Sequence, residues 1–166
     1  MLVIAVVASG WLQFRETTDP GRRAVSREGP DLFVDDMDLR LVDADGRLRY
    51  HLTADRLEHY PVDDRAELVQ PVLHVFEKGR TAWQIAAERG SIASGYETVW
   101  LLGAVEIERP ATAGSRPLTI HTRDLLVKPD AQTAETVNTT RIRSDRFDVE
   151  TKGLHADFRD DVLELK

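Results

Sequence analysis

Apolar and polar residues alternate with a period of two along most of the chain after residue 31. This period is typical of β-strands that bury one face and expose the other to water. No long stripe with the 3.6-residue period of an amphipathic helix follows. The pattern therefore predicts an all-β domain over residues 32–166. Its clearest segments contain Trp83, Ile85 and Ala87; Val99, Leu101, Val105 and Ile107; Leu118, Ile120 and Thr122; and Phe147, Val149 and Thr151.

The best-defined pair of strands surrounds Asp45-Gly46, a dipeptide that favours a two-residue hairpin turn. With the turn there, one face of the hairpin is apolar or aromatic and the other is polar. The apolar face pairs Met37 with Ala54, Leu39 with Leu52 and Leu41 with Tyr50, and the polar face pairs Asp38 with Thr53 and Arg40 with His51. Such a hairpin covers a core or a ligand channel on one side and faces water on the other.

A longer pattern recurs along the domain. Similar sequence segments begin at Ala54, Ala87, Thr122 and Thr151, which are 33, 35 and 29 residues apart. Three residues later come Leu57, Gly90, Leu125 and Leu154; fourteen later come Leu68, Leu101, Thr136 and Leu165; eighteen later, in three copies, come Val72, Val105 and Thr140. Each copy predicts a strand, a turn and a returning strand. Hairpins that cannot bury their own apolar faces stack on their neighbours. The alternative is that four hairpins of similar length share these residues by chance.

The last copy stops at Lys166, just after Leu165, where the earlier copies continue into another strand. This predicts an unpaired sheet edge at the carboxyl terminus. Such an edge is either guarded by charges or used to add a strand from a partner. The charges available there are Arg159, Asp160, Asp161, Glu164 and Lys166.

Residues 1–14 carry no charged side chain, and Trp11 and Phe14 stand near their end, where aromatic residues meet a membrane interface. We interpret this segment as a transmembrane anchor truncated at its start, because a full span takes about 20 apolar residues. A cleaved secretory signal and a buried segment of a soluble protein are the alternatives. Residues 15–31 contain Thr, Pro, Gly and charges that cancel, which is typical of a linker.

Composition narrows the class of protein. The chain has 166 residues, 42% hydrophobic residues and a formal charge of -7, which fits a single globular domain. The absence of cysteine excludes disulfides, thiolate zinc sites and a cysteine nucleophile. The excess of acidic over basic residues disfavours nucleic acid as a partner.

The motifs of catalysis and metal binding are missing from the sequence. The five histidines, at positions 51, 59, 74, 121 and 155, lack metal-ligand spacing. Residues 43–46 resemble the start of a calcium loop, but the glycine comes too early and the closing glutamate is absent. The acidic pairs at 35–36, 63–64 and 160–161 have turn-like settings that favour solvated charges. We therefore expect no enzymatic activity, no metal and no cofactor.

Several segments together resemble the LptC family of bitopic inner-membrane proteins in lipopolysaccharide export. They are residues 45–54, Tyr60, residues 70–73, residues 83–87 and residues 102–107, in this order and spacing. The resemblance implies a half-open antiparallel β jelly roll of stacked hairpins, like that of LptA, behind an N-terminal membrane helix. It also implies a single-pass protein of the inner membrane with its β domain in the periplasm. Lipopolysaccharide would arrive from the LptB/LptF/LptG transporter and pass to periplasmic LptA.

On this reading, the acyl chains of lipopolysaccharide lie in a groove, and the carboxyl-terminal edge faces LptA. The anchor and the other β edge would contact the transporter. The expected groove residues are Met37, Leu39, Leu41, Tyr50, Leu52, Leu68, Leu101, Val105, Ile120 and Phe147, and the expected LptA-facing residues are Val162, Leu163 and Leu165. Two alternatives stay open: a structural scaffold that only joins partners by strand addition, and a soluble LptA-like carrier with a cleaved signal.

Overall fold

The computed structural model describes residues 29–77, 79–93, 98–111, 116–128, 131, 133–157 and 162–165. These ranges contain strands and turns and no helix, so the predicted all-β class is confirmed for them. The strands are β1 (Leu32–Val42), β2 (Leu48–Tyr60), β3 (Arg65–Val69), β4 (Val72–Glu77), β5 (Arg80–Ile92), β6 (Val99–Arg109), β7 (Leu118–Lys128), β8 (Thr133–Ser144), β9 (Asp148–Asp157) and β10 (Val162–Leu165). The predicted anchor at 1–14 and most of the linker at 15–31 lie outside the described residues.

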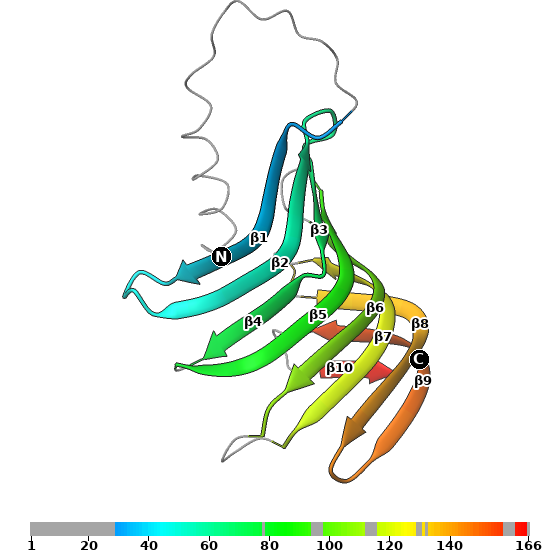
Figure 1. The fold of residues 1–166 in the computed structure, drawn as a ribbon. Helices are drawn as coiled ribbons and strands as arrows, with labels where there is room; N and C mark the ends of the chain where they lie inside the picture. The colour runs from blue at the N-terminus through cyan, green and yellow to red at the C-terminus, as the bar shows by residue number, and fades with distance from the viewer. Residues whose placement is uncertain are drawn as a thin grey trace, which may run out of the picture.

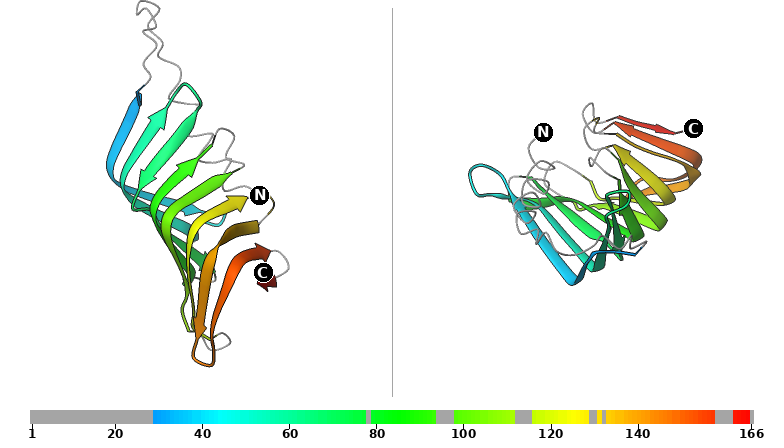
Figure 2. Two further views of the ribbon diagram at one scale, coloured as in Figure 1. Left: turned by 90° about the vertical axis from the view of Figure 1, so that its right-hand side faces the viewer. Right: turned by 90° about the horizontal axis from the view of Figure 1, so that it is seen from above.

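All ten strands form a single antiparallel sheet, in the order β1-β2-β3-β5-β6-β7-β8-β9-β10. Strand β4 also lies between β2 and β5, so β3 and β4 together fill one place in the sheet. Figure 2 shows the strands side by side from β1 at one end to β10 at the other. Within the described residues the sheet does not close on itself, and β1 and β10 are its two edge strands.

The five residue pairs predicted for the first hairpin are all present between β1 and β2. The turn itself is longer than predicted. The N–H of Gly46 donates to the carbonyl of Asp43, and the N–H of Asp43 donates to the carbonyl of Arg47. Gly46 adopts a φ of 76°, which glycine adopts without a steric penalty. A register shift after Leu41 absorbs the additional residue.

Each long strand bends midway, and the bends line up into a crease that runs across the sheet (Figure 1). The crease follows from a break in the period-two pattern. In β2, Ala54 and Leu57 both lie on the inner, concave face although Leu57 is three positions after Ala54, an odd step that would place them on opposite faces of a regular strand. The same three-residue step occurs in β5, β7 and β9, and it is the step that recurs in the sequence. The inner-face pairs there are Ala87 and Gly90, Thr122 and Leu125, and Thr151 and Leu154.

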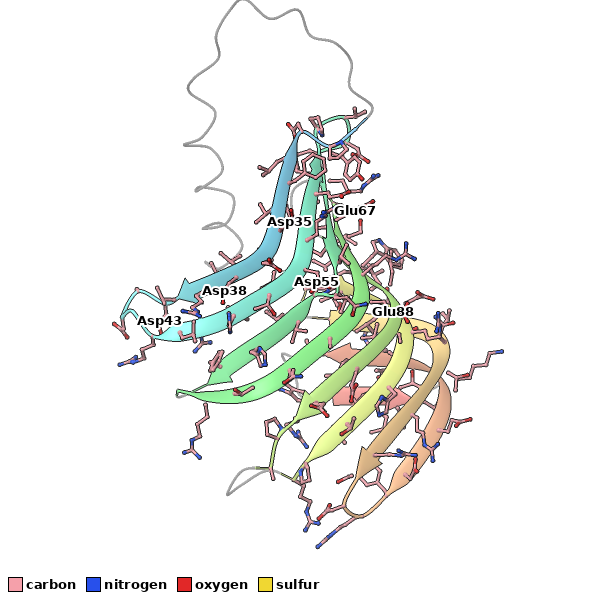
Figure 3. The ribbon with its side chains drawn as sticks, in the orientation of Figure 1. Asp35, Asp38, Asp43, Asp55, Glu67 and Glu88 are labelled. Atoms are coloured by element: carbon pink, nitrogen blue, oxygen red, sulfur yellow. The ribbon has the colours of Figure 1, made fainter. Side chains whose placement is uncertain are left out.

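The two residues inside each three-residue step lie on the convex face and are mostly charged. They are Asp35-Asp36, Asp55-Arg56, Glu88-Arg89, Arg123-Asp124 and Lys152-Gly153. In Figure 3, Asp35, Asp55 and Glu88 follow the line where their strands bend. Charged side chains in consecutive positions keep water on the convex side of the crease. Asp35-Asp36 therefore lies within a strand, which corrects the turn predicted there, whereas Asp63-Asp64 does lie in a turn.

Unusual backbone conformations concentrate at the crease. Asp36, Gln70 and Asp124 have φ near +50°, a region that Asp and Asn tolerate better than other side chains do. The Asp124 carboxylate accepts the N–H of Gly103 on the neighbouring strand at 2.9 Å. Thr122 and Thr140, on the neighbouring strands β7 and β8, share a hydrogen bond of 2.9 Å at the crease. Side-chain bonds thus replace ladder bonds where the strands bend.

The first repeat copy departs from the others at Pro71. Proline lacks an N–H and interrupts the ladder, which splits this arm of the hairpin into β3 and β4. Val72 consequently pairs with Thr53 and Ala86 on the convex face. The predicted equivalence of Val72 with the inner-face Val105 is therefore wrong.

We expect Gly103→Ala to destabilise the domain more than Gly79→Ala does. Both glycines have φ near +75°, so each substitution strains the backbone by roughly 1–2 kcal/mol. A methyl group at Gly79 meets open space, whereas one at Gly103 lies 2.9 Å from Cβ of Glu88. Overpacking adds about 1–3 kcal/mol at Gly103. Urea denaturation of the two variants measures the difference, and equal losses would contradict the close approach at the crease.

Candidate functional site

The crease divides the sheet into two walls that face each other. We call the side that contains β4 the β4 wall and the side that contains β3 the β3 wall. On the β4 wall, a continuous row of aliphatic residues crosses eight strands. The row consists of Leu39, Leu52, Leu73, Ile85, Ile107, Ile120, Ile142 and Val149, each directly opposite the next. This row lines the inner face along the length of the sheet.

Burial of the inner face changes along the row. Its residues on β1, β2, β4 and β5 are partly exposed, whereas Ile107, Ile120 and Ile142 are buried. The buried part belongs to a cluster in which the two walls pack together. From the β3 wall, this cluster contains Leu125, Ala134, Leu154 and Ala156. The walls therefore touch in the β5–β9 half, and their inner faces stay accessible near β1 and β2.

A cavity of about 310 Å³ lies between the walls in the β5–β9 half. Its lining is apolar except for Arg109 and Asp157, and it includes side chains from both walls and from β10. The apolar part of the lining comprises Trp83, Ile107, Leu118, Ile120, Leu125, Ala134, Ile142, Phe147, Val149, Leu154, Ala156, Val162 and Leu165. A volume of this size is at the lower end of the range for small-molecule pockets. It suits a hydrocarbon chain rather than a whole glycolipid.

The ten expected groove residues fall into three groups in the structure. Five are half-buried on the inner face of the first hairpin: Met37, Leu39, Leu41, Tyr50 and Leu52. Three are buried in the crease region, with exposed fractions of 4% or less: Leu68, Val105 and Ile120. Leu101 packs beside the buried cluster, and Phe147, which is 48% exposed, lines the cavity together with Ile120. All ten positions await a test of lipid contact.

Several lining residues were not expected from the sequence, among them Leu73, Leu118, Ile142 and Arg109. Leu118 and Ile142 lie two residues from Ile120 and Thr140, which the sequence pattern included, whereas the pattern included Val72 in place of its neighbour Leu73. Arg109 continues a period-two run, two residues after Ile107, but a charged residue breaks an apolar pattern. The alternation of inner and outer positions along β6 was the sequence signal that could have placed Arg109 on the inner face.

The two edge strands differ in length. Strand β1 has eleven residues and exposes Leu32, Phe33 and Val34. Strand β10 has four residues and pairs with β9 only. Of the residues expected to face LptA, Val162 and Leu165 are partly exposed and line the cavity, and Leu163 pairs with Ala156 in the ladder.

His59 is a buried titratable side chain at the β1 end of the inner face. Its Nδ1 lies 2.7 Å from a carboxylate oxygen of Asp31, and its Nε2 lies 3.1 Å from one of Asp64. Burial of the ring opposes protonation, but the hydrogen bonds to the two carboxylates outweigh it and raise the pKa of His59 above 6.5. The ring therefore joins the segment just before β1 to the turn after β2.

The described residues include no group of three or more His, Asp or Glu side chains placed to hold a metal ion. Within the same ranges, no helix is long and apolar enough to cross a membrane.

Comparison with known proteins identifies the family. A family model described as lipopolysaccharide-assembly, LptC-related, matches residues 1–166. The chain belongs to the LptC-related family. The resemblance noted in the sequence is thereby confirmed, and this LptC-related protein has a role in lipopolysaccharide transport.

A solved structure shares the fold of this LptC-related chain. LptH of Pseudomonas aeruginosa, the LptA-homologous periplasmic component of the lipopolysaccharide transport device, superposes with a TM-score of 0.55 at 10% sequence identity. The match covers 70% of this chain and 80% of LptH. No curated protein matches the sequence.

The raised pKa of His59 predicts that the domain loses stability as pH rises. A group that binds its proton more tightly in the folded state stabilises that state fully below its unfolded pKa of about 6.5. The contribution disappears as pH rises through the folded value. Urea denaturation at pH 6 and pH 9 should show this loss in wild type and a smaller loss in His59→Gln.

His121→Gln is the matched control, because His121 is exposed on the convex face of β7. It should keep the wild-type difference between the two pH values. The same pH dependence in wild type and His59→Gln would contradict the role of the Asp31–His59–Asp64 contacts.

Proposed function

We propose that this protein binds the acyl chains of lipopolysaccharide between its two walls and passes the lipid along the sheet. The observation that carries the proposal is the aliphatic row on the β4 wall, which is continuous from β1 to β9 and accessible near β1. Removing one CH₂ group from water contributes about 0.8 kcal/mol, so several acyl chains gain substantial free energy there. The sugars stay in water outside the walls.

The open sheet suits a large amphiphile. A closed barrel would have to pass bulky sugars through its lumen, whereas an open trough lets them move beside it. The inner-face side chains on β1 and β2 are already accessible. In the β5–β9 half, lipid enters the 310 Å³ cavity first and reaches buried residues such as Val105 only when the walls separate.

The two sheet edges are the proposed contacts with other transport proteins. Long exposed edges invite pairing with another strand, and soluble proteins usually block them. Strand β1, with its exposed Phe33, is the proposed contact for the LptB/LptF/LptG transporter, together with an anchor at residues 1–14. Strand β10 is the proposed contact for LptA. Added strands would extend the inner face from one protein to the next.

This role requires no catalysis and no cofactor, and we propose a non-enzymatic protein anchored to the inner membrane with its β domain in the periplasm. The family and the fold support this arrangement. A cleaved amino terminus, found by mass spectrometry of the mature protein, would favour the soluble carrier instead.

The packed cluster in the β5–β9 half favours a second candidate, a scaffold that joins its partners through strand addition without holding lipid. Under this candidate the inner face of β1 and β2 would have no lipid contact in an assembled complex.

Photo-crosslinking at Leu39 separates the two candidates. A photoreactive residue at this half-buried inner position should capture lipopolysaccharide in cells that are exporting it. The same residue at Arg40, which is exposed on the opposite face of the same strand, is the matched control. Mass-shifted product at Leu39 and none at Arg40 is expected. No product at Leu39, Leu52 or Ile85 in folded, transporter-bound protein would rule out the conduit.

Proline substitution tests the β10 edge. Successive residues of a strand direct their N–H groups to opposite sides, so one of Val162 and Leu163 faces the free edge. Proline there removes a donor without breaking the β9 ladder. One of Val162→Pro and Leu163→Pro should weaken LptA capture and leave the melting temperature and the transporter complex intact. Unchanged LptA capture by both variants would exclude pairing through β10.

A further inference from the structure

Arg109 is an unusual lining residue of the cavity. It is the last residue of β6, and it lies on the inner face of the β4 wall at the margin away from the crease. Its guanidinium carbon lies 5.2 Å from the centroid of the Trp83 ring, a cation–π contact. Its Nε is buried and makes no hydrogen bond in the described part of the chain. A buried guanidinium N–H without an acceptor costs free energy that a bound anion would recover.

Three other arginines near this end of the β4 wall are already engaged. Arg116 pairs with Asp145, and Arg141 and Arg143 both pair with Asp148. Hydrogen bonding from Arg141, assisted by Arg143, lowers the pKa of the Asp148 carboxyl to about 2. Arg109 has no carboxylate within ion-pair distance among the described residues, so it can accept an anion without breaking an existing pair.

We propose that Arg109 binds a phosphate on the head group of the lipid whose acyl chains occupy the cavity. This inference rests on the proposed function. The cavity accepts hydrocarbon toward the crease, where Leu125 and Leu154 lie, and Arg109 stands at the opposite margin, where a head group must emerge into water. Arginine forms two parallel hydrogen bonds with a phosphate, and these bonds are strong because both partners are charged. The guanidinium therefore sets the depth and direction of the lipid.

The second charged residue of the lining is Asp157, on the β3 wall. It lies on the wall opposite Arg109, so a phosphate bound by the guanidinium lies on the β4 side of the opening. Asp157 also offers an alternative role for Arg109, in which the two residues close the walls through an ion pair. In that case the charge of the lipid would not matter.

The test compares two lipids with the same acyl chains, bisphosphorylated lipid A and its enzymatically dephosphorylated form, on the purified full chain. Wild type should bind the phosphorylated lipid about tenfold more tightly, the loss expected when a charge-assisted pair of bonds is missing. Arg109→Gln should bind both lipids with the affinity that wild type has for the dephosphorylated one. Arg123→Gln, on the convex face of β7, is the matched control and should keep the preference.

The outcomes separate this inference from the proposed function. If neither lipid binds wild type, both fail. If both lipids bind equally well to wild type, or if Arg109→Gln keeps the preference, only the head-group assignment fails. Loss of stability in Arg109→Gln and Asp157→Asn with an unchanged preference assigns Arg109 to wall closure and overturns the proposal.

A second measurement does not depend on the folding of Arg109→Gln. The chain has three tryptophans, and Trp11→Phe with Trp100→Phe leaves Trp83 as the only one. Because Arg109 covers the ring of Trp83, phosphorylated lipid A should shift its emission differently from the dephosphorylated lipid. Inorganic phosphate at the same concentration should cause no shift. An equal shift with inorganic phosphate, or identical shifts with the two lipids, would overturn the proposal.

Discussion

The crease is the constraint on which the rest of the structure depends. A strand that crosses it must place inner-face residues on both walls. Strands β2, β5, β7 and β9 do so by a three-residue step that leaves two adjacent side chains on the convex face. Pairs such as Asp55-Arg56 and Glu88-Arg89 fill these positions with charge. Water then solvates the outside of the bend while aliphatic side chains fill the inside. A single sheet thereby obtains two facing apolar surfaces without a second layer, which is what a trough requires.

The two walls pack together in the β5–β9 half of the trough and stay apart near β1 and β2. This difference connects the fold to the proposed lipid transport. Where the walls touch, Leu125 and Ile142 exclude water and stabilise the domain. Where they part, Leu39 and Leu52 remain available to a ligand. A protein that must stay folded while empty and also hold a large lipid needs both properties. Separating them along the strand order lets one half supply stability while the other supplies access.

Much of the fold follows from local pattern. Alternation identified the strands, and Asp45-Gly46 set a register that the structure reproduces pair by pair despite a longer turn. The repeat spacing contained the crease as well, because every copy begins with a three-residue step that alternation alone does not produce. The repeat spacing alone does not predict a bend, because each three-residue step, taken singly, resembles a turn. The position of Pro71 in place of Val72 depends on contacts between strands distant in sequence, which no local pattern specifies. Arg109 has the same parity as Ile107, but its charge breaks the apolar pattern from which the inner face was predicted.

The rows of the sheet run across the strands, so a lipid that moves along them, as proposed, travels perpendicular to the strands. Nine strands succeed one another in the sheet order, and neighbouring strands lie about 4.8 Å apart, so their eight spacings give a track of roughly 40 Å. Each additional hairpin lengthens this track by about 10 Å and leaves its cross-section unchanged. The length of the track and its cross-section are therefore independent of each other in this architecture. Duplication or loss of one hairpin would change the distance over which the track can hold a lipid, while the cross-section that decides which lipid fits would stay the same.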